Sequence, residues 1–122
     1  MNLIYNFAIN LYLIAIKSSS PFNKKARLWV KGRKNIFKIL KEKLESDQET
    51  AWFHCASLGE FEQARPLIEN FREQFTKHKI LLTFFSPSGF ETRKNYDKAD
   101  YVFYLPIDTA RNAKRLVDIV NP

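Results

Sequence analysis

The second half of the chain alternates between short apolar runs and helical patterns, and this alternation limits the possible fold more than any other feature. Apolar runs at residues 51–56, 79–85 and 101–105 have the length of β-strands. Each run is followed by a turn and a segment with helical spacing, at residues 61–75, 90–96 and 109–120. Strands that alternate with helices form a parallel sheet with right-handed crossovers. The sequence therefore predicts an α/β, Rossmann-like domain over residues 50–122.

The preceding residues differ from this domain in composition. Residues 1–16 are almost wholly apolar, and residues 17–43 contain ten lysines and arginines but only one acid, Glu42. Residues 44–122 carry ten bases and twelve acids, so the net charge of +7 belongs to one segment. Only the total charge suggests a nucleic-acid partner, and its confinement to one segment argues against that class. We interpret residues 17–49 as a basic linker that contains a helix with apolar spacing at Ile36, Ile39, Leu40 and Leu44.

The apolar run at residues 3–16 is too short to cross a bilayer. As a helix it would extend about 21 Å, against about 30 Å of hydrocarbon. One of its faces is formed by Leu3, Phe7, Leu11 and Ile14, as in a helix that lies in the membrane interface. The basic flank is expected to attract anionic lipids and to orient the domain toward the cytoplasm. The alternatives are a buried N-terminal helix, or a signal peptide, which the position of the charge disfavours.

Ligands of open α/β sheets bind beyond the carboxyl ends of the strands. Three loops are expected at that edge, at residues 57–59, 86–89 and 106–108. None contains a GxGxxG fingerprint or a P-loop. The single cysteine excludes an internal disulfide, and no spacing of ligands suggests a metal. We expect no cofactor and no metal.

Glu60 is the residue at this edge whose role is most open. Ser57 and Glu60 have the spacing of a capping box, in which the serine caps the helix and the glutamate reaches back to the amide of the capping residue. Helical phase, however, places Glu60 on the stripe that Phe61, Ile68 and Phe71 direct toward the sheet. A partly buried carboxylate beside the ligand crevice is suited to accept a proton. Capping and catalysis both remain open for this residue.

The other polar residues of the edge have simpler interpretations. Ser86, Ser88 and Gly89 start a helix and predict either an anion site or a plain turn, and Ser88 with Glu91 repeats the capping-box spacing. Asp108 is the expected N-cap of the last helix. His54 and Cys55 are adjacent on a strand, so they point to opposite faces and cannot form a catalytic pair. Both are interpreted as core residues, with a supporting role at the crevice as the alternative for His54.

Four segments together carry a family resemblance: RLWVKGRK, WFHCASLGEFEQARPLI, LLTFFSPSGFE and YVFYLPIDT. In this order and spacing, the chain resembles the N-terminal half of the bacterial 3-deoxy-D-manno-octulosonic acid (Kdo) transferases over essentially its whole length. The resemblance implies a monotopic inner-membrane enzyme of two Rossmann-like domains, the GT-B architecture. The N-terminal domain would receive the lipid A precursor, and a C-terminal domain absent from these residues would bind the donor, CMP-Kdo.

The resemblance also assigns roles to residues. The S-x-G-E motif of the family places its catalytic glutamate at Glu60, and the expected acceptor-binding residues are Ser57, Gly59, Ser86, Ser88 and Gly89. Ser88 stands where threonine is commoner, which keeps the hydroxyl. The implied function is transfer of Kdo from CMP-Kdo to lipid IVA at the cytoplasmic face of the inner membrane, with inversion and with Glu60 as general base. The alternative is a membrane-tethered binding module without catalysis.

Overall fold

A computed structural model describes residues 2–19, 23–44, 49–107 and 109–122. In chain order the elements are α1 (Asn2–Ser19), α2 (Lys24–Arg33), α3 (Ile36–Lys43), β1 (Thr50–Cys55), α4 (Leu58–Gln74), β2 (Lys79–Phe84), α5 (Pro87–Arg93), β3 (Tyr101–Tyr104) and α6 (Ala110–Val120). Each strand and helix predicted for residues 50–122 is present, with ends shifted by up to three residues.

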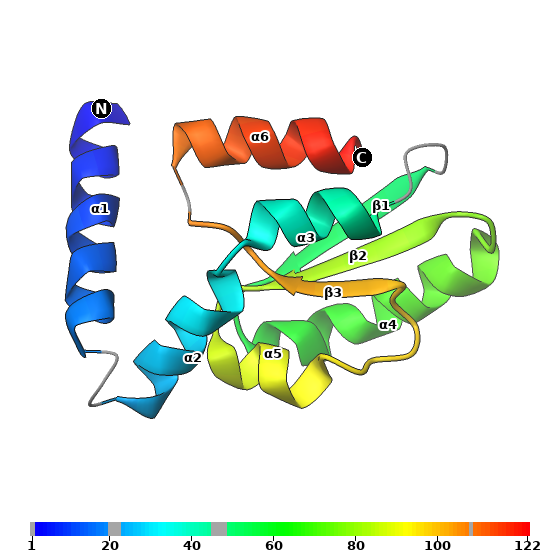
Figure 1. The fold of residues 1–122 in the computed structure, drawn as a ribbon. Helices are drawn as coiled ribbons and strands as arrows, with labels where there is room; N and C mark the ends of the chain where they lie inside the picture. The colour runs from blue at the N-terminus through cyan, green and yellow to red at the C-terminus, as the bar shows by residue number, and fades with distance from the viewer. Residues whose placement is uncertain (1, 20–22, 45–48, 108) are drawn as a thin grey trace.

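The three strands form one parallel sheet in the order β1-β2-β3. Helices α4 and α5 cover one face of this sheet, and α3 and α6 cover the other (Figure 1). The α/β class and the parallel sheet with flanking helices are therefore confirmed. The central strand, β2, is buried on both sides because its alternate side chains enter the two apolar clusters. Ile80 and Leu82 pack with α4, whereas Leu81 packs with α3 and α6.

The edge strand β1 is covered less completely, and this corrects one prediction. Cys55 is buried in the cluster beneath α4, but His54 on the opposite face is exposed. The prediction that His54 is a core residue is therefore wrong. The physical reason is that β1 has a neighbouring strand on only one side within the described residues, so its apolar sequence does not guarantee burial of every side chain.

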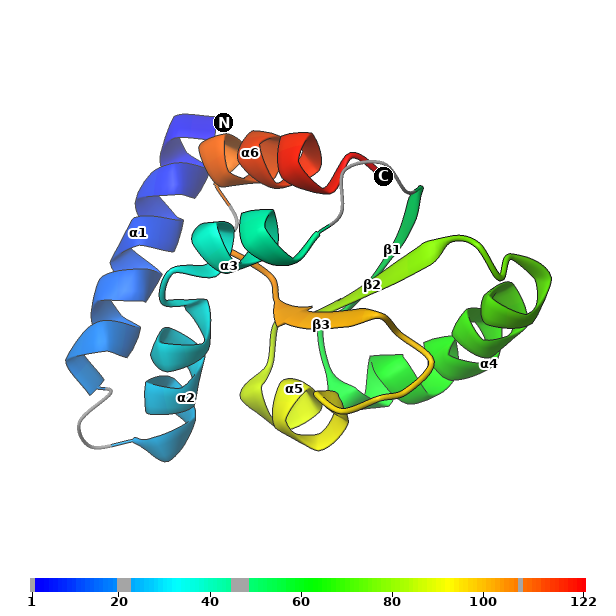
Figure 2. The same ribbon diagram turned by 45° about the vertical axis from the view of Figure 1, so that its right-hand side comes forward.

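The residues expected to be a linker form two helices that pack against the domain. Ile36 and Leu40 of α3 are buried against Leu116 and Val120 of α6. Between α2 and α3 the backbone of Asn35 adopts the left-handed conformation, with φ of 58°. Asparagine tolerates this conformation better than most residues. The turn lets α3 lie on the sheet face while α2 lies at the carboxyl edge of the sheet (Figure 2).

Arg33 attaches α2 to this edge. Its Nε donates to the Leu105 carbonyl at 2.8 Å, and Nη2 donates to the Phe85 carbonyl at 2.9 Å. The guanidinium carbon lies 4.1 Å from the Trp29 ring centroid and 4.8 Å from that of Tyr104. The side chain is only 8% exposed, and burial lowers the pKa of Arg33 to about 10. A planar cation with several donors can satisfy two carbonyls and stack on aromatic rings at once.

The glycine before Arg33 is required by the same contact. A Cβ atom on Gly32 would lie 2.0 Å from Cε2 of Tyr104, well inside van der Waals contact. The Tyr104 ring, in turn, stacks on Phe90 of α5 with a centroid distance of 4.2 Å. The sequence RLWVKGRK thus contains the residues that fit α2 against the ends of β2 and β3.

The predicted N-terminal helix is present as α1, and its apolar face is exposed. Exposed fractions lie between 58% and 84% for Leu3, Phe7, Leu11 and Ile14. The alternative of a buried N-terminal helix is therefore wrong. Helix α1 packs on α2 through an edge-to-face contact between Tyr12 and Trp29, whose centroids are 6.1 Å apart. In the described part of the chain, no helix has the length and apolarity needed to cross a bilayer.

The role of Arg33 predicts a specific loss of stability. Arg33→Lys keeps the positive charge, but an ammonium group cannot reproduce the fork that serves both carbonyls. We expect the free energy of unfolding to fall by about 1–3 kcal/mol. Urea denaturation followed by circular dichroism measures this change. The matched control is Arg27→Lys on the exposed side of α2, which should stay within about 0.5 kcal/mol of the parent. Equal midpoints for the two variants would contradict the role of Arg33.

Candidate active site at the carboxyl edge of the sheet

The loops that follow β1 and β2 lie side by side. The Ser86 amide donates to the Ala56 carbonyl at 3.0 Å. A Cβ on Gly89 would lie 3.2 Å from the Leu58 amide nitrogen, which shows how closely the second loop approaches the first. The parallel sheet thus brings residues 57–60 and 86–89 together, as expected for strands that end at the same edge.

The third loop, after β3, does not join the other two but lies on the opposite face of the sheet from α4. Ile107 lines a pocket of about 320 Å³ with Trp52 and His54, on the face of the sheet that α6 covers. Asp108, the predicted N-cap of the last helix, lies outside the described residues. The N-cap of α6 is Thr109, whose hydroxyl accepts a hydrogen bond from the Asn112 amide at 3.2 Å.

Ser57 and Glu60 together close the start of α4. Ser57 has extended backbone, and its hydroxyl accepts from the Glu60 amide at 3.2 Å. Oε2 of Glu60 accepts from the Ala56 amide at 2.5 Å. The glutamate thus reaches one residue beyond the serine amide that the capping-box spacing predicts. The effect is to fasten the end of β1 to the first turn of α4 through one carboxylate oxygen.

The side chain of Glu60 is exposed, so the prediction that it is partly buried on the sheet-facing stripe is wrong. Leu67, seven residues further along α4, is also exposed, at 62%. Residues seven apart on a helix lie within about 20° of each other. Glu60 and Leu67 therefore share the margin of the stripe, which opens to solvent, while Phe61 and Ile68 at its centre are fully buried. The consequence is a fixed carboxylate that a ligand can reach.

Among the described residues, only one oxygen of this carboxylate accepts a hydrogen bond. Oε2 binds the Ala56 amide, and no donor among the described residues binds Oε1. Cys55 lies close by, but burial raises the pKa of its thiol, and the negative charge of Glu60 raises it further. A buried neutral thiol is not a nucleophile. Cys55 is therefore not a candidate base or nucleophile, whereas Glu60 is an exposed carboxylate that could accept a proton.

The second loop is organised by Ser86. Its hydroxyl accepts from the Gly89 amide at 3.1 Å, and Pro87 follows as the first residue of α5. The predicted capping box of Ser88 and Glu91 is wrong, because Ser88 lies inside the helix and is exposed. Proline at the first helical position explains this start, since its fixed φ suits that position. The hydrogen bond of Ser86 fits the plain turn, and anion binding by this loop stays a prediction.

The two glycines of the site differ in their surroundings. A Cβ on Gly89 would lie 2.7 Å from Cδ1 of Phe84, so packing requires glycine there. A Cβ on Gly59 would meet only the Ser57 hydroxyl, at 3.8 Å. Neither glycine has a positive φ. Packing therefore explains Gly89 but not Gly59.

A buried threonine was missed by the sequence analysis. Thr83 is fully buried in β2, and its hydroxyl accepts from Nε1 of Trp52 at 2.9 Å. The same hydroxyl lies 2.9 Å from Nδ1 of His54. The only sequence signal for this network is one polar residue inside the apolar run KILLTFF. In the ranges that the structure describes, no group of histidine, cysteine and acidic side chains forms a metal site.

Comparison with known proteins identifies the class and then the family. Residues 31–122 match the model of a glycosyltransferase N-terminal region, which defines the class. The description of that model is 3-deoxy-D-manno-octulosonic-acid transferase, or Kdo transferase, and the chain belongs to this family. The match includes both site loops and Arg33. The resemblance found in the sequence is confirmed.

Individual relatives agree with this assignment. The chain is 35% identical over 83 residues to the 3-deoxy-D-manno-octulosonic acid transferase of Aquifex aeolicus, covering 67% of this chain and 23% of the relative. The enzyme of the same name from Chlamydia trachomatis serovar D is 32% identical over 70% of the chain and 20% of its own length. A bifunctional glycosyltransferase/methyltransferase of Fusobacterium nucleatum is 30% identical over 98% of the chain and 17% of its own length. The chain thus spans about a fifth of these relatives. No solved structure matches it significantly.

The different surroundings of the two glycines give a paired prediction. Gly89→Ala should lower the free energy of unfolding by about 1–3 kcal/mol, because the new methyl group overlaps Phe84. Gly59→Ala should leave it unchanged or raise it by about 0.4–1 kcal/mol, because alanine restricts the unfolded chain at a helical position with free space. Thermal denaturation of both variants checks this. A Gly59→Ala variant that is the less stable of the two would refute this reading of the packing.

Proposed function

We propose that this chain is the acceptor-side region of an inverting Kdo transferase of GT-B architecture, which transfers Kdo from CMP-Kdo to the lipid A precursor lipid IVA. The observation that carries the proposal is Glu60, an exposed carboxylate fixed at the carboxyl edge of the sheet within the family match. In this proposal, a further domain binds CMP-Kdo, and the loops described above face the acceptor.

The chemistry assigned to Glu60 is proton removal. A glucosamine hydroxyl of the acceptor attacks the anomeric carbon of Kdo, and Oε1 of Glu60 takes the hydroxyl proton as the new C–O bond forms. The bond from the anomeric carbon to the phosphate oxygen of CMP breaks, and CMP leaves with the electron pair. Attack opposite the leaving group inverts the anomeric centre. General-base catalysis of this kind contributes about 10²–10⁴ in rate.

Positioning is the second contribution of this region. Ser57, Gly59, Ser86, Ser88 and Gly89 are the residues that we propose to frame the acceptor. Ser57 and Ser86 use their hydroxyl oxygens as helix caps, which fixes the two loops. Ser88 is exposed next to them, with its hydroxyl 3.5 Å from that of Ser86. Holding an acceptor hydroxyl in line with the donor reduces the entropic part of the barrier.

We also propose that α1 attaches the protein to the cytoplasmic face of the bacterial inner membrane. Two observations support this: the exposed apolar face of α1, and the ten basic residues between residues 17 and 43. An interfacial helix buries its apolar face among the acyl chains, and nearby cations attract anionic head groups. Attachment of this kind would bring the site to a lipid acceptor.

The first test separates capping from catalysis at Glu60 in the full-length protein. Glutamine can still accept the Ala56 amide, but it has almost no proton affinity near neutral pH. Glu60→Gln should therefore lower kcat by roughly 10²-fold or more with the melting temperature little changed. Glu60→Ala should lose the cap as well, at a cost of about 0.5–1 kcal/mol of stability. Kdo transfer to lipid IVA and thermal denaturation are the measurements.

The matched control is Glu73→Gln, which removes an exposed carboxylate from the last turns of the same helix. Its turnover should equal that of the parent. Parental turnover in Glu60→Gln would show that Glu60 is a cap only and that another group removes the proton. The non-catalytic binding module would be favoured by two results together: Glu60→Gln binds the acceptor as tightly as the parental protein does, and the full-length parental protein shows no turnover.

The second test concerns membrane attachment by α1. Phe7→Glu with Leu11→Glu places two charges on the open apolar face. Binding to vesicles of phosphatidylglycerol and phosphatidylcholine should weaken by at least about tenfold, since each buried apolar side chain contributes about 1.5–3 kcal/mol. Co-sedimentation measures the bound fraction. Leu67→Glu with Phe75→Glu makes the same change of charge on two exposed apolar residues, one in α4 and one at its C-cap. Equal loss in the two pairs would rule out α1 as the attachment site.

A further inference from the structure

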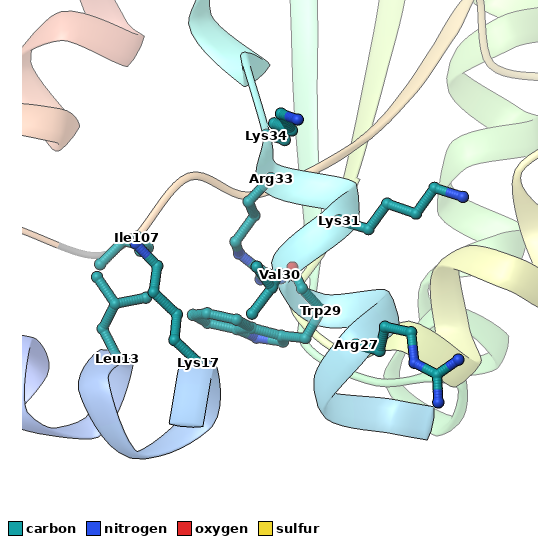
Figure 3. A pocket seen from close by; sticks show the side chains of 9 residues that line it. All are labelled: Leu13, Lys17, Arg27, Trp29, Val30, Lys31, Arg33, Lys34 and Ile107. Carbon is teal, nitrogen blue, oxygen red and sulfur yellow. Dashed lines mark hydrogen bonds between the residues drawn. The ribbon is translucent and has the colours of Figure 1, made fainter. Parts of the chain in front are cut away.

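A pocket of about 570 Å³ lies between α1, α2 and the loop after β3, apart from the candidate active site. Its volume is typical of small-molecule sites, which range from about 300 to 1,000 Å³. Figure 3 shows its lining residues, which are Leu13, Lys17, Arg27, Trp29, Val30, Lys31, Arg33, Lys34 and Ile107. No residue of the two loops beside Glu60 lines it.

The wall of this pocket is apolar where α1 and α2 face each other. Trp29 and Val30 of α2 lie opposite Leu13 and Ile107 (Figure 3). Trp29 is 5% exposed and is held in place by Arg33, which stacks on its ring. The apolar surface is therefore a fixed part of the fold, supported by the contact that docks α2.

The margin of the pocket is strongly basic. Arg27 and Lys31 are spaced by four residues, which places them on one face of α2, and Lys34 lies in the turn directly after this helix. Among the described residues, no carboxylate forms an ion pair with any of these three side chains. Figure 3 shows Arg27 and Lys31 extending from α2 on the side away from Leu13, so these charges border the apolar wall without filling it.

An amphiphile with an anionic head matches this combination. The pocket adjoins the open apolar face of α1, because Lys17, which lines the pocket, lies three residues after the exposed Ile14 and is its neighbour on the helix surface. A lipid in the membrane surface would therefore reach the pocket from the face that α1 presents to the bilayer. No residue of the two site loops lines the pocket, so the sugar of an acceptor does not occupy it while its hydroxyl approaches Glu60.

We propose that the pocket between α1 and α2 binds one anionic glycerophospholipid, with an acyl chain against Trp29 and Val30 and the phosphate near Lys31 and Lys34. This inference rests on the proposed membrane attachment and is independent of the proposed sugar transfer. Its consequence is that attachment is specific: a single bound lipid fixes the angle between α1 and α2, beyond the general attraction of a basic segment to a charged surface.

The test uses monomeric dihexanoyl-phosphatidylglycerol, below its micelle concentration, titrated into the full-length protein by isothermal calorimetry. We expect saturable binding with one site. Lys31→Ala with Lys34→Ala should weaken it about tenfold or more. The matched control, Lys38→Ala with Lys41→Ala, removes two exposed lysines of the same basic segment that do not line the pocket, and it should bind like the parent. Val30→Asp should abolish binding while circular dichroism shows the fold retained.

Two further ligands define the site. Dihexanoyl-phosphatidylcholine, which has the same chains but no net charge, and glycerol 3-phosphate, which has the anion but no chains, should each bind at least about tenfold more weakly. Equal losses in the two lysine pairs would overturn the proposal in favour of diffuse attraction. Equal affinity for either control ligand would also overturn it. The titration contains neither CMP-Kdo nor a sugar acceptor, so its result is separate from the outcome for the Glu60 variants.

Discussion

The buried guanidinium of Arg33 is the interaction on which the arrangement of the N-terminal helices depends. Its hydrogen bonds reach carbonyls at the ends of two strands, and its plane stacks on Trp29 and Tyr104. Burial of a cation is costly, and here carbonyl dipoles and aromatic faces offset the cost in place of a carboxylate. Because α2 is fixed to the strand ends, Trp29 is held where Tyr12 of α1 packs on it, and the pocket borders this contact. One of the carbonyls belongs to Phe85, so the same contact also holds the start of the loop at Ser86.

Capping and catalysis are compatible at Glu60 because a carboxylate has two oxygens. The Ala56 amide occupies one of them, which restricts the rotation of the side chain, and no donor among the described residues binds the other. A base that is already oriented loses little conformational entropy when a substrate arrives. In the proposed mechanism the cap would therefore preorganise the base, so that one hydrogen bond both stabilises the first turn of α4 and holds the carboxylate in place.

The sequence was most informative where structure is local. Strands and helices after residue 50 follow from periodicity, and the adjacency of the two loops follows from the parallel sheet. It was least informative where burial depends on neighbouring elements. His54 is exposed because β1 is an edge strand, and Glu60 is exposed because it lies at the margin of the apolar stripe of α4. Pro87 is the first residue of α5, so the N-cap of this helix is Ser86 and not the predicted Ser88. The partners of Arg33 could not be predicted, because no periodic pattern connects a residue with carbonyls 52 and 72 positions away.

That separation along the chain has a consequence for biosynthesis. A ribosome delivers α1 and α2 long before the carbonyl of Leu105 exists, since Leu105 lies 72 positions after Arg33 in the chain. Contacts between such distant residues form late, because the intervening loop must close first. Throughout that interval α2 lacks its docking surface, while the apolar face of α1 is already complete. If α1 binds lipid as proposed, the emerging polypeptide has this helix before its folded domain, so attachment to a bilayer during translation would precede closure of the sheet against α2.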